Sequence, residues 1–467
     1  MVFSSLIFLF QFLPLFLSVY FLAPSSMRNL VLLGASILFY AWGEPAYIVL
    51  LLFGLVFDYV NGRLIDRFRH RKALSRSILI FSVAGNLLIL GFFKYAGFLV
   101  DNLNDWLALG WEAPDLTLPI GLSFYTFQSL SYVLDVYRGK AASQRNVLNF
   151  GTYVMMFPQL VAGPIVKYGD IARQLLFRRV GLSSFGKGAE LFIRGLAKKV
   201  LIANNLGMLW TDVKTTPPTE LAVLSAWLGI AAFALQIYFD FSGYSDMARG
   251  LARMLGFRLK INFNYPYMSR SVTEFWRRWH ISLGSWFREY VYIPLGGNRR
   301  GFAYQLRNLA VVWLLTGLWH GASWNFAIWG LYFGFLVTME KLFLLKWLER
   351  SKPMAHIYLI LAVLSGWVWF EHENLADAIR FMGAMFGMVS NEWADNQAFY
   401  QLLTYGGLIA ASAFCATSFP RKALLRFAHR KRRAASVLVP IVYAILLLLS
   451  TAYLVDETYN PFLYFRF

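Results

Sequence analysis

The stretch "SVLVPIVYAILLLLSTAYLV", Ser436 to Val455, is an apolar run without a single charged side chain. A helix of about 20 apolar residues spans a lipid bilayer. The run follows "RKALLRFAHRKRR" (Arg421–Arg433), which has seven Lys and Arg and no acid, and it ends at Asp456 and Glu457. Basic residues gather in cytoplasmic loops. The stretch therefore predicts a span that starts in the cytoplasm and ends outside.

The rest of the chain has the same character. Of its 467 residues, 58% are hydrophobic and only 15% are charged, and the mean hydropathy is +0.51. A soluble protein this apolar could not cover its core with polar surface. We expect an all-α polytopic integral membrane protein with about twelve transmembrane helices. Residues 1–467 would form one domain, in which residues 436–467 supply the last span and an aromatic tail outside the cytoplasm.

The net charge of +19 raises the question of a nucleic-acid partner. The basic residues, however, cluster in loops between apolar runs, as cytoplasmic loops do. No basic face carries a base-stacking or groove-reading motif, so no nucleic acid is expected. Gly62–Arg76, with six basic residues, and Arg421–Arg433 would face the cytoplasm. The alternation of loop charge then places both termini outside it.

Two regions do not fit a simple series of spans. "FPQLVAGPIV" (Phe157–Val166) contains Pro and Gly and is expected to be re-entrant. Phe239–Asn308 is too polar to cross a membrane and too aromatic for an ordinary loop, so amphipathic and re-entrant segments are expected there. Irregular backbone at membrane depth is tolerated only when it is buried in protein or lines a wet cavity.

Ionisable groups inside apolar segments mark candidate functional sites. His320 lies between two apolar runs, His280 lies in a basic and aromatic stretch, and "YFDFSGYSDMARG" contains Asp240 and Asp246. An imidazole, with an unperturbed pKa near 6.5, can act as a base at neutral pH. The alternative for His320 is a buried histidine that serves packing. For His280, the two preceding arginines favour an interfacial position.

Metal and thiol chemistry are not expected. The single cysteine, Cys415, permits neither an intramolecular disulfide nor a cysteine metal cluster. The histidines and carboxylates show no tight ligand spacing such as H-x-x-x-H.

Six stretches, in order, resemble signature motifs of the membrane-bound O-acyltransferase family. They are "GLSFYTFQSLSYVLDVYRG", "QLVAGPI", "YFDFSGYSDMA", "NFNYPY", "TEFWRRWHISLGSWFREYVYIPLGGNR" and "GLWHGASWNFAIWG". They are most similar to the bacterial branch typified by alginate O-acetyltransferase, with the peptidoglycan O-acetyltransferases close by. The resemblance extends from the opening "MVFSSLIFLFQFLP" to the aromatic tail, essentially the whole chain.

The resemblance implies a central tunnel through the bacterial inner membrane with the family's invariant histidine, here His320, at its waist. The second, more variable polar position falls on His280. It also implies a cytosolic acyl thioester donor, such as acetyl-CoA, and no tightly bound cofactor. The implied partner is a periplasmic SGNH-type O-acetyltransferase or another polymer-modification protein.

This chemistry agrees with the residues around the motif. His320 would remove the proton from a hydroxyl, which is a poor nucleophile without a base. Trp319 and Trp324 would exclude water that otherwise hydrolyses the thioester. Asp240 and Asp246 would support the tunnel.

The tail "NPFLYFRF" (Asn460–Phe467) is almost wholly aromatic, and Tyr464 carries its only hydroxyl. Bacterial relatives that feed exported polymers have a similar terminal motif, whose tyrosine is thought to relay the acyl group. The resemblance implies that role for Tyr464. The alternative is an aromatic belt at the membrane interface.

The expected function is the transfer of an acyl group, taken to be acetyl, from a cytosolic thioester across the membrane for O-acetylation of an exported polysaccharide. Alginate or a similar exopolysaccharide is the expected acceptor, and peptidoglycan is the alternative. Two rivals from other classes are an anion transporter and a non-catalytic scaffold of a secretion complex. Many transporters contain internal repeats, and this sequence shows none.

Overall fold

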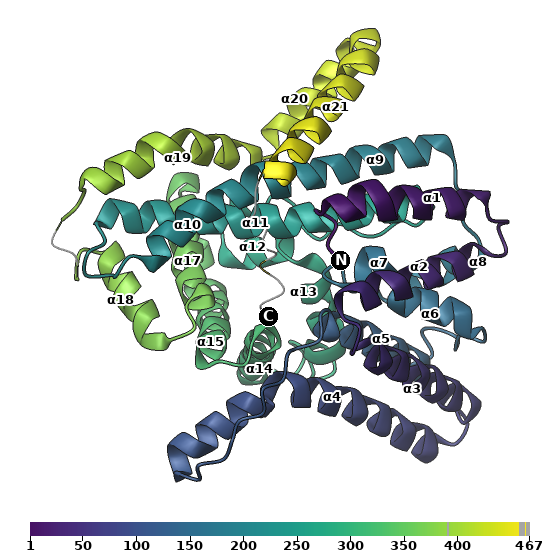
Figure 1. Cartoon of the computed structure of the whole chain (residues 1–467). Coiled ribbons are helices and arrows are strands. Elements are labelled where there is room, and N and C mark those ends of the chain that lie inside the picture. Colours follow the sequence, from purple (N-terminus) through teal and green to yellow (C-terminus); the bar gives the residue numbers. More distant parts are fainter. Residues whose placement is uncertain (390–391, 457–462, 464–467) are drawn as a thin grey trace. The chain divides into compact units, whose positions relative to one another are not determined.

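The computed structural model describes residues 1–389, 392–456 and 463 (Figure 1). Every regular element in this part of the chain is a helix, which confirms the all-α expectation. Two compact units are present: unit 1 is Met1–Phe192 with Ser245–Lys260, and unit 2 is Ile193–Tyr244 with Ile261–Phe467. The single domain expected over residues 1–467 stays a prediction.

Unit 1 is built from the amino-terminal helices. They are η1 (Phe8–Phe12), α1 (Leu13–Leu22), α2 (Arg28–Gly43), α3 (Ile48–Arg67), α4 (Lys72–Leu107), α5 (Leu122–Tyr137), α6 (Val147–Met155), α7 (Phe157–Leu160) and α8 (Tyr168–Leu176). Two further helices contribute residues to both units, namely α9 (Leu182–Ala197) and α11 (Val223–Met254).

Unit 2 contains the remaining elements. They are η2 (Lys198–Asn204), α10 (Asn205–Thr215), η3 (Pro266–Met268), α12 (Val272–Arg278), α13 (Ile281–Phe287), η4 (Arg288–Tyr292), α14 (Phe302–His320), α15 (Trp324–Met339), η5 (Glu340–Leu344), α16 (Leu345–Leu348), α17 (Lys352–Glu371), α18 (Leu375–Met385), α19 (Asn396–Cys415), α20 (Phe419–Arg430) and α21 (Arg432–Asp456).

Seven helices of the described chain are long and apolar enough to cross a membrane. They are Ile48–Arg67, Lys72–Leu107, Val223–Met254, Trp324–Leu348, Lys352–Glu371, Asn396–Cys415 and Arg432–Asp456. A shorter apolar helix covers Phe8–Leu22. The protein is thus polytopic as expected, whereas the count of about twelve spans is not confirmed by this criterion.

In unit 1, the segment expected to be re-entrant is a broken helix. α6 ends at Met155, the single turn α7 follows, and the backbone then runs without regular structure up to Lys167. Every residue of Phe157–Val166 is buried. Phe157 packs against other buried rings, with Phe16 at a centroid distance of 5.1 Å and Phe39 at 5.3 Å. The irregular backbone therefore lies where protein surrounds it.

The expectation for Phe239–Asn308 is wrong in its first part. α11 does not end near Phe239 but continues through "YFDFSGYSDMARG" to Met254. Asp240, Ser242 and Asp246 of this stretch are all buried. The polar side chains of this stretch are therefore shielded by the surrounding chain, and a polar side chain buried with a partner does not end a helix. The later part of the region consists of short helices, as expected.

In unit 2, α14 and α15 form a helical hairpin and pack closely against each other (Figure 1). Glycines allow their backbones to meet: Gly317 of α14 lies against the carbonyl of Phe326, and Gly330 of α15 lies against the carbonyl of Trp313. Small residues are enriched where membrane helices approach closely. The hairpin holds its turn, where His320 ends α14, in a fixed place.

Gly330→Ala is expected to destabilise the protein by about 1–3 kcal/mol, because the added Cβ overlaps the backbone oxygen of Trp313. Thermal unfolding in detergent micelles would measure the loss. The matched control is Gly91→Ala in α4, where the new Cβ meets no atom within 4 Å. Equal unfolding temperatures for the two variants would show that α14 and α15 can move apart without loss of stability.

Candidate active site

His320 is the last residue of α14, and only 3% of it is exposed. Three aromatic rings meet its imidazole edge to face, with centroid distances of 5.0 Å to Trp319, 5.0 Å to Trp329 and 5.3 Å to Phe370. Such a cage keeps bulk water away from the imidazole. A base in this setting can act on a substrate hydroxyl without promoting hydrolysis of an activated acyl group.

His280 lies just before α13 and caps that helix. Its backbone has φ 43° and ψ 53°, the left-handed region that non-glycine residues rarely occupy. Strained backbone of this kind clusters at functional sites. The imidazole is buried, with a centroid distance of 4.8 Å to the ring of Phe241.

The hydrogen bonds of His280 indicate its tautomer. Nδ1 accepts from the backbone N–H of Leu283 at 3.4 Å, so the ring proton lies on Nε2. Burial lowers the pKa of His280 to about 3, which keeps the ring neutral at pH 7. Nε2 is then a hydrogen-bond donor, suited to bind a carbonyl oxygen.

The structure brings these two histidines together through one indole. The ring centroid of Trp319 lies 5.0 Å from that of His320 and 5.9 Å from that of His280. Trp319 is buried, whereas Trp324 is 53% exposed at the start of α15. Trp319 is therefore placed to shield the site. The same role for Trp324 is a prediction that its exposed position does not support.

A cavity of about 210 Å³ lies beside His280 in unit 2. Its lining includes His280, Arg288 and, from α14, Thr316. Thr316 precedes His320 by one helical turn and so shares its face of α14. The volume corresponds to about seven water molecules at 30 Å³ each, which is sufficient for a small acyl group.

The two predicted supporting carboxylates have different environments. Asp240 is buried in unit 2 and forms an ion pair with the equally buried Lys199, with 2.9 Å between Oδ1 and Nζ. Asp246 belongs to unit 1, where Arg249 lies 3.1 Å from its Oδ1. Tyr464 lies outside the described residues. Only Asp240 therefore shares a unit with the two histidines.

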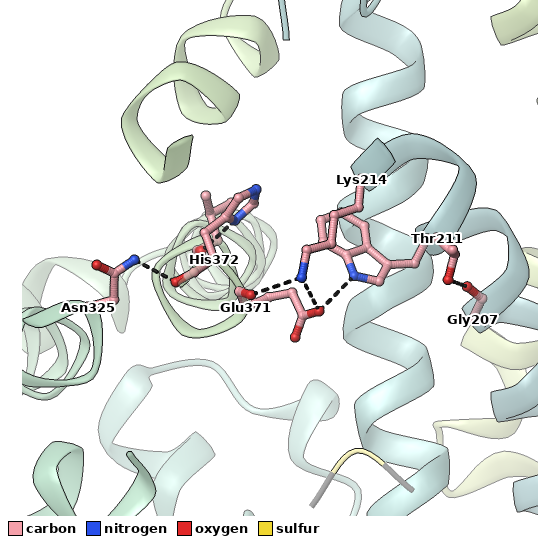
Figure 2. A network of polar contacts seen from close by, with 8 residues as sticks. Gly207, Thr211, Lys214, Asn325, Glu371 and His372 are labelled. Carbon is pink, nitrogen blue, oxygen red and sulfur yellow. Dashed lines mark hydrogen bonds and ion pairs between the residues drawn. The ribbon is translucent and has the colours of Figure 1, made fainter. Parts of the chain in front are cut away.

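A polar network next to Phe370 was not anticipated from the sequence (Figure 2). Glu371 Oε1 accepts from Lys214 Nζ at 2.9 Å and from Trp210 Nε1 at 3.2 Å. These bonds join the end of α17 to α10. Because Phe370 precedes Glu371 in α17, these hydrogen bonds also fix the position of Phe370, whose ring contacts His320.

A second bond fixes the same end of α17 to α15. Asn325 Nδ2 donates to the backbone oxygen of His372 at 2.6 Å (Figure 2). The only signal in the sequence was a pair of ionisable residues, Glu371 and His372, at the end of an apolar run. Their partners come from segments far away in the chain, so the network could not be inferred. Among the described residues, no group of three or more His, Cys, Asp or Glu side chains could hold a metal ion.

Known proteins match this chain over most or all of its length. The model of the membrane-bound O-acyltransferase family matches residues 141–370, which include both histidines and Asp240. "Probable alginate O-acetylase AlgI" of Pseudomonas putida is 41% identical over 100% of both chains. The protein of the same name from Azotobacter vinelandii is 45% identical over 83% of this chain and 78% of its own.

A relative with another name is more distant. "Peptidoglycan O-acetyltransferase" of Helicobacter pylori is 34% identical over 83% of this chain and 80% of its own. The family match, the identity over the full length and the helical membrane fold agree: the chain belongs to the membrane-bound O-acyltransferase family.

Proposed function

We propose that this O-acyltransferase takes an acetyl group from a cytosolic thioester and passes it across the membrane for O-acetylation of an exported polysaccharide, alginate or a similar exopolysaccharide. The observation that carries the proposal is the burial of His320 in an aromatic cage at the turn of the closely packed α14–α15 hairpin. The names of the relatives at 41–45% identity support alginate. Peptidoglycan is the second candidate acceptor, supported by the relative at 34%.

In the proposed reaction, His320 accepts the proton of an attacking hydroxyl. The hydroxyl oxygen forms a bond to the thioester carbonyl carbon, the C–S bond breaks, and the thiolate leaves and takes up the proton. His280 donates a hydrogen bond from Nε2 to the carbonyl oxygen and orients the acyl group. The rings around His320 exclude competing water.

The proposed nucleophile is the hydroxyl of Tyr464. A phenol, with a pKa near 10 in its ordinary state, is a better leaving group than an alkyl alcohol. The acetyl-tyrosine ester would therefore stay reactive for transfer to a periplasmic SGNH-type O-acetyltransferase or another polymer-modification protein. A tail tethered to the last span reaches the site at high effective concentration, whereas a large polymer does not enter a narrow tunnel.

The proposed donor is acetyl-CoA or another acyl thioester, bound as a substrate rather than as a resident cofactor. Basic side chains near the site, including Arg277, Arg278 and the cavity residue Arg288, would attract its negative charge.

The decisive assay uses the purified protein in liposomes with a radiolabelled acetyl thioester. The proposal expects release of free thiol together with transfer of label to the chain. An anion transporter would move solute without consuming the thioester, and a scaffold would do neither. Absence of thiol release from folded protein would therefore reject the enzyme assignment.

His280→Ala is expected to lower the rate by about fivefold, less than the loss for His320→Ala. One hydrogen bond contributes roughly 1 kcal/mol, and 1.36 kcal/mol is a tenfold change in rate. Thiol release under saturating donor measures both variants. His429→Ala, on an exposed side chain, is the control. Equal losses at His280 and His320 would show that His280 has the larger role.

We further propose that both termini lie outside the cytoplasm of a bacterial inner membrane. The reason is the position of basic loops, and the test is a tag placed after Phe467. Protease added to intact spheroplasts is expected to remove this tag but to spare one inserted between α3 and α4 at Arg69. Protection of the carboxy-terminal tag from protease would show that the carboxy terminus lies in the cytoplasm and would overturn the proposed orientation.

A further inference from the structure

A buried ion pair in unit 2 contacts the backbone of the carboxy-terminal tail. Asp240 Oδ1 lies 2.9 Å from Lys199 Nζ, and Asp240 Oδ2 accepts a hydrogen bond from the backbone N–H of Leu463 at 3.0 Å. The exposed fractions are 1% for Asp240, 3% for Lys199 and 5% for Leu463. One carboxylate oxygen thus pairs with a cation and the other binds the tail.

A contribution to folding stability does not explain why this ion pair is buried. Removing two charges from water is costly, and apolar replacement of a buried ion pair is often neutral or stabilising. Such pairs are better attested where they specify one arrangement of the chain. Here Lys199 fixes the orientation of the carboxylate, so that Oδ2 of Asp240 faces the backbone of Leu463. A hydrogen bond to an ionised acceptor is about twice as strong as a neutral one.

The bound segment lies in the same core as the aromatic cage of His320. The side chain of Leu463 is part of a buried cluster that also includes Trp329 and Phe370. Both of these rings contact the imidazole of His320. The residue after Leu463 in the sequence is Tyr464.

We propose that the Lys199–Asp240 ion pair is the dock of the carboxy-terminal tail, and that it holds Leu463 in the core of unit 2 so that the next residue is presented to the acyl-transfer site. Asp240 and Lys199 are positioning residues, not catalytic ones. Because the dock binds a backbone N–H, it recognises the path of the tail rather than a side chain. The role given to the dock rests on the proposed acyl relay through Tyr464. Docking of the tail itself can be measured without an acyl-transfer assay.

The test measures how fast a cysteine at position 463 reacts with maleimide in the full-length protein. Leu463→Cys is made in a Cys415→Ala background, since Cys415 is exposed. Adding Lys199→Met and Asp240→Leu keeps apolar volume in place of the pair but removes the acceptor of the tail N–H. Labelling at position 463 is expected to become at least about tenfold faster, the equivalent of one lost hydrogen bond to a charged group.

Two controls separate docking from folding. Lys199→Gln with Asp240→Asn removes the charges but keeps an amide oxygen as acceptor, so slow labelling should be retained in large part. Tyr453→Cys, on an exposed residue of α21, should react at one rate in every background. Unchanged labelling at position 463 in the apolar double variant, with its unfolding temperature preserved, overturns the proposal.

A second variant leaves the ion pair intact in case the apolar pair does not fold. Leu463→Pro removes the backbone donor together with the leucine side chain. Leu463→Ala, which loses the side chain but keeps the N–H, is the matched control, and Phe465→Cys serves as the reporter in both. Labelling of the reporter is expected to be about tenfold or more faster with Leu463→Pro than with Leu463→Ala, and equal rates in these two variants overturn the proposal. The relay and the dock can fail separately: Tyr464→Phe leaves docking intact, so an active Tyr464→Phe protein rejects the relay alone.

Discussion

His320→Ala is expected to lower the rate of thiol release by about 10²- to 10⁴-fold, the usual contribution of a general base. The reason is that the imidazole of His320 contacts all three rings of the aromatic cage, Trp319, Trp329 and Phe370, whereas His280 approaches the cage through Trp319. Purified wild-type and variant proteins in liposomes, supplied with saturating acetyl thioester, give the ratio directly. Circular dichroism and thermal unfolding of the same samples show whether the fold is preserved.

The control for this loss is His320→Gln, which keeps a polar side chain of similar length but cannot act as a base at neutral pH. Both variants should lose activity to a similar extent, while Gln preserves more of the packing. Activity within about tenfold of wild type in a folded His320→Gln protein would exclude the base role. His320 would then be a packing residue at the end of α14.

Tyr464→Phe is expected to reduce acetylation of the exported polymer in cells by more than about tenfold. The substitution keeps the aromatic ring and removes only the hydroxyl that would carry the acetyl group. The acetyl content of the secreted polysaccharide, measured by NMR in a strain that has only the variant gene, is the readout. Comparable amounts of protein in the membrane must be verified by immunoblot.

The matched control is Tyr453→Phe, which removes the hydroxyl of an exposed tyrosine in the last turns of α21. It is expected to leave acetylation unchanged. Normal acetylation by the Tyr464→Phe strain would mean that the tail only anchors the protein, as an aromatic belt does. Loss of acetylation in both variants would show that the effect comes from changes at the end of the last span in general and not from the hydroxyl of Tyr464.

Much of this protein follows from the order of its residues. Uninterrupted apolar runs such as Ser436–Val455 have no stable state in water, and in a bilayer they must satisfy every backbone hydrogen bond internally, so helices were the necessary outcome. The "WHG" motif likewise marked His320 as the candidate base before any geometry was known. These features are local, since each depends on residues close together in the chain.

Other features depended on contacts between distant residues. The polar residues that follow Phe239, among them Asp240, predicted that the apolar segment ends there. In the structure, Lys199 forms an ion pair with Asp240, and α11 continues to Met254. The sequence likewise placed both Trp319 and Trp324 beside His320, whereas in the structure the ring of Trp319 contacts the imidazole and Trp324 is exposed.

The relation between the two histidines was decided in the same way. His280 and His320 are far apart in sequence, and they come close because His280, at the start of α13, packs against Trp319, the residue before His320 in α14. The ion pair of Lys214 with Glu371 fixes a third element beside them. Residue order determined the membrane helices and marked His320 as the candidate base, because both depend on local chemistry. The tertiary structure alone decided which charges are paired and which rings enclose the site, because burial and distance exist only once the helices have packed.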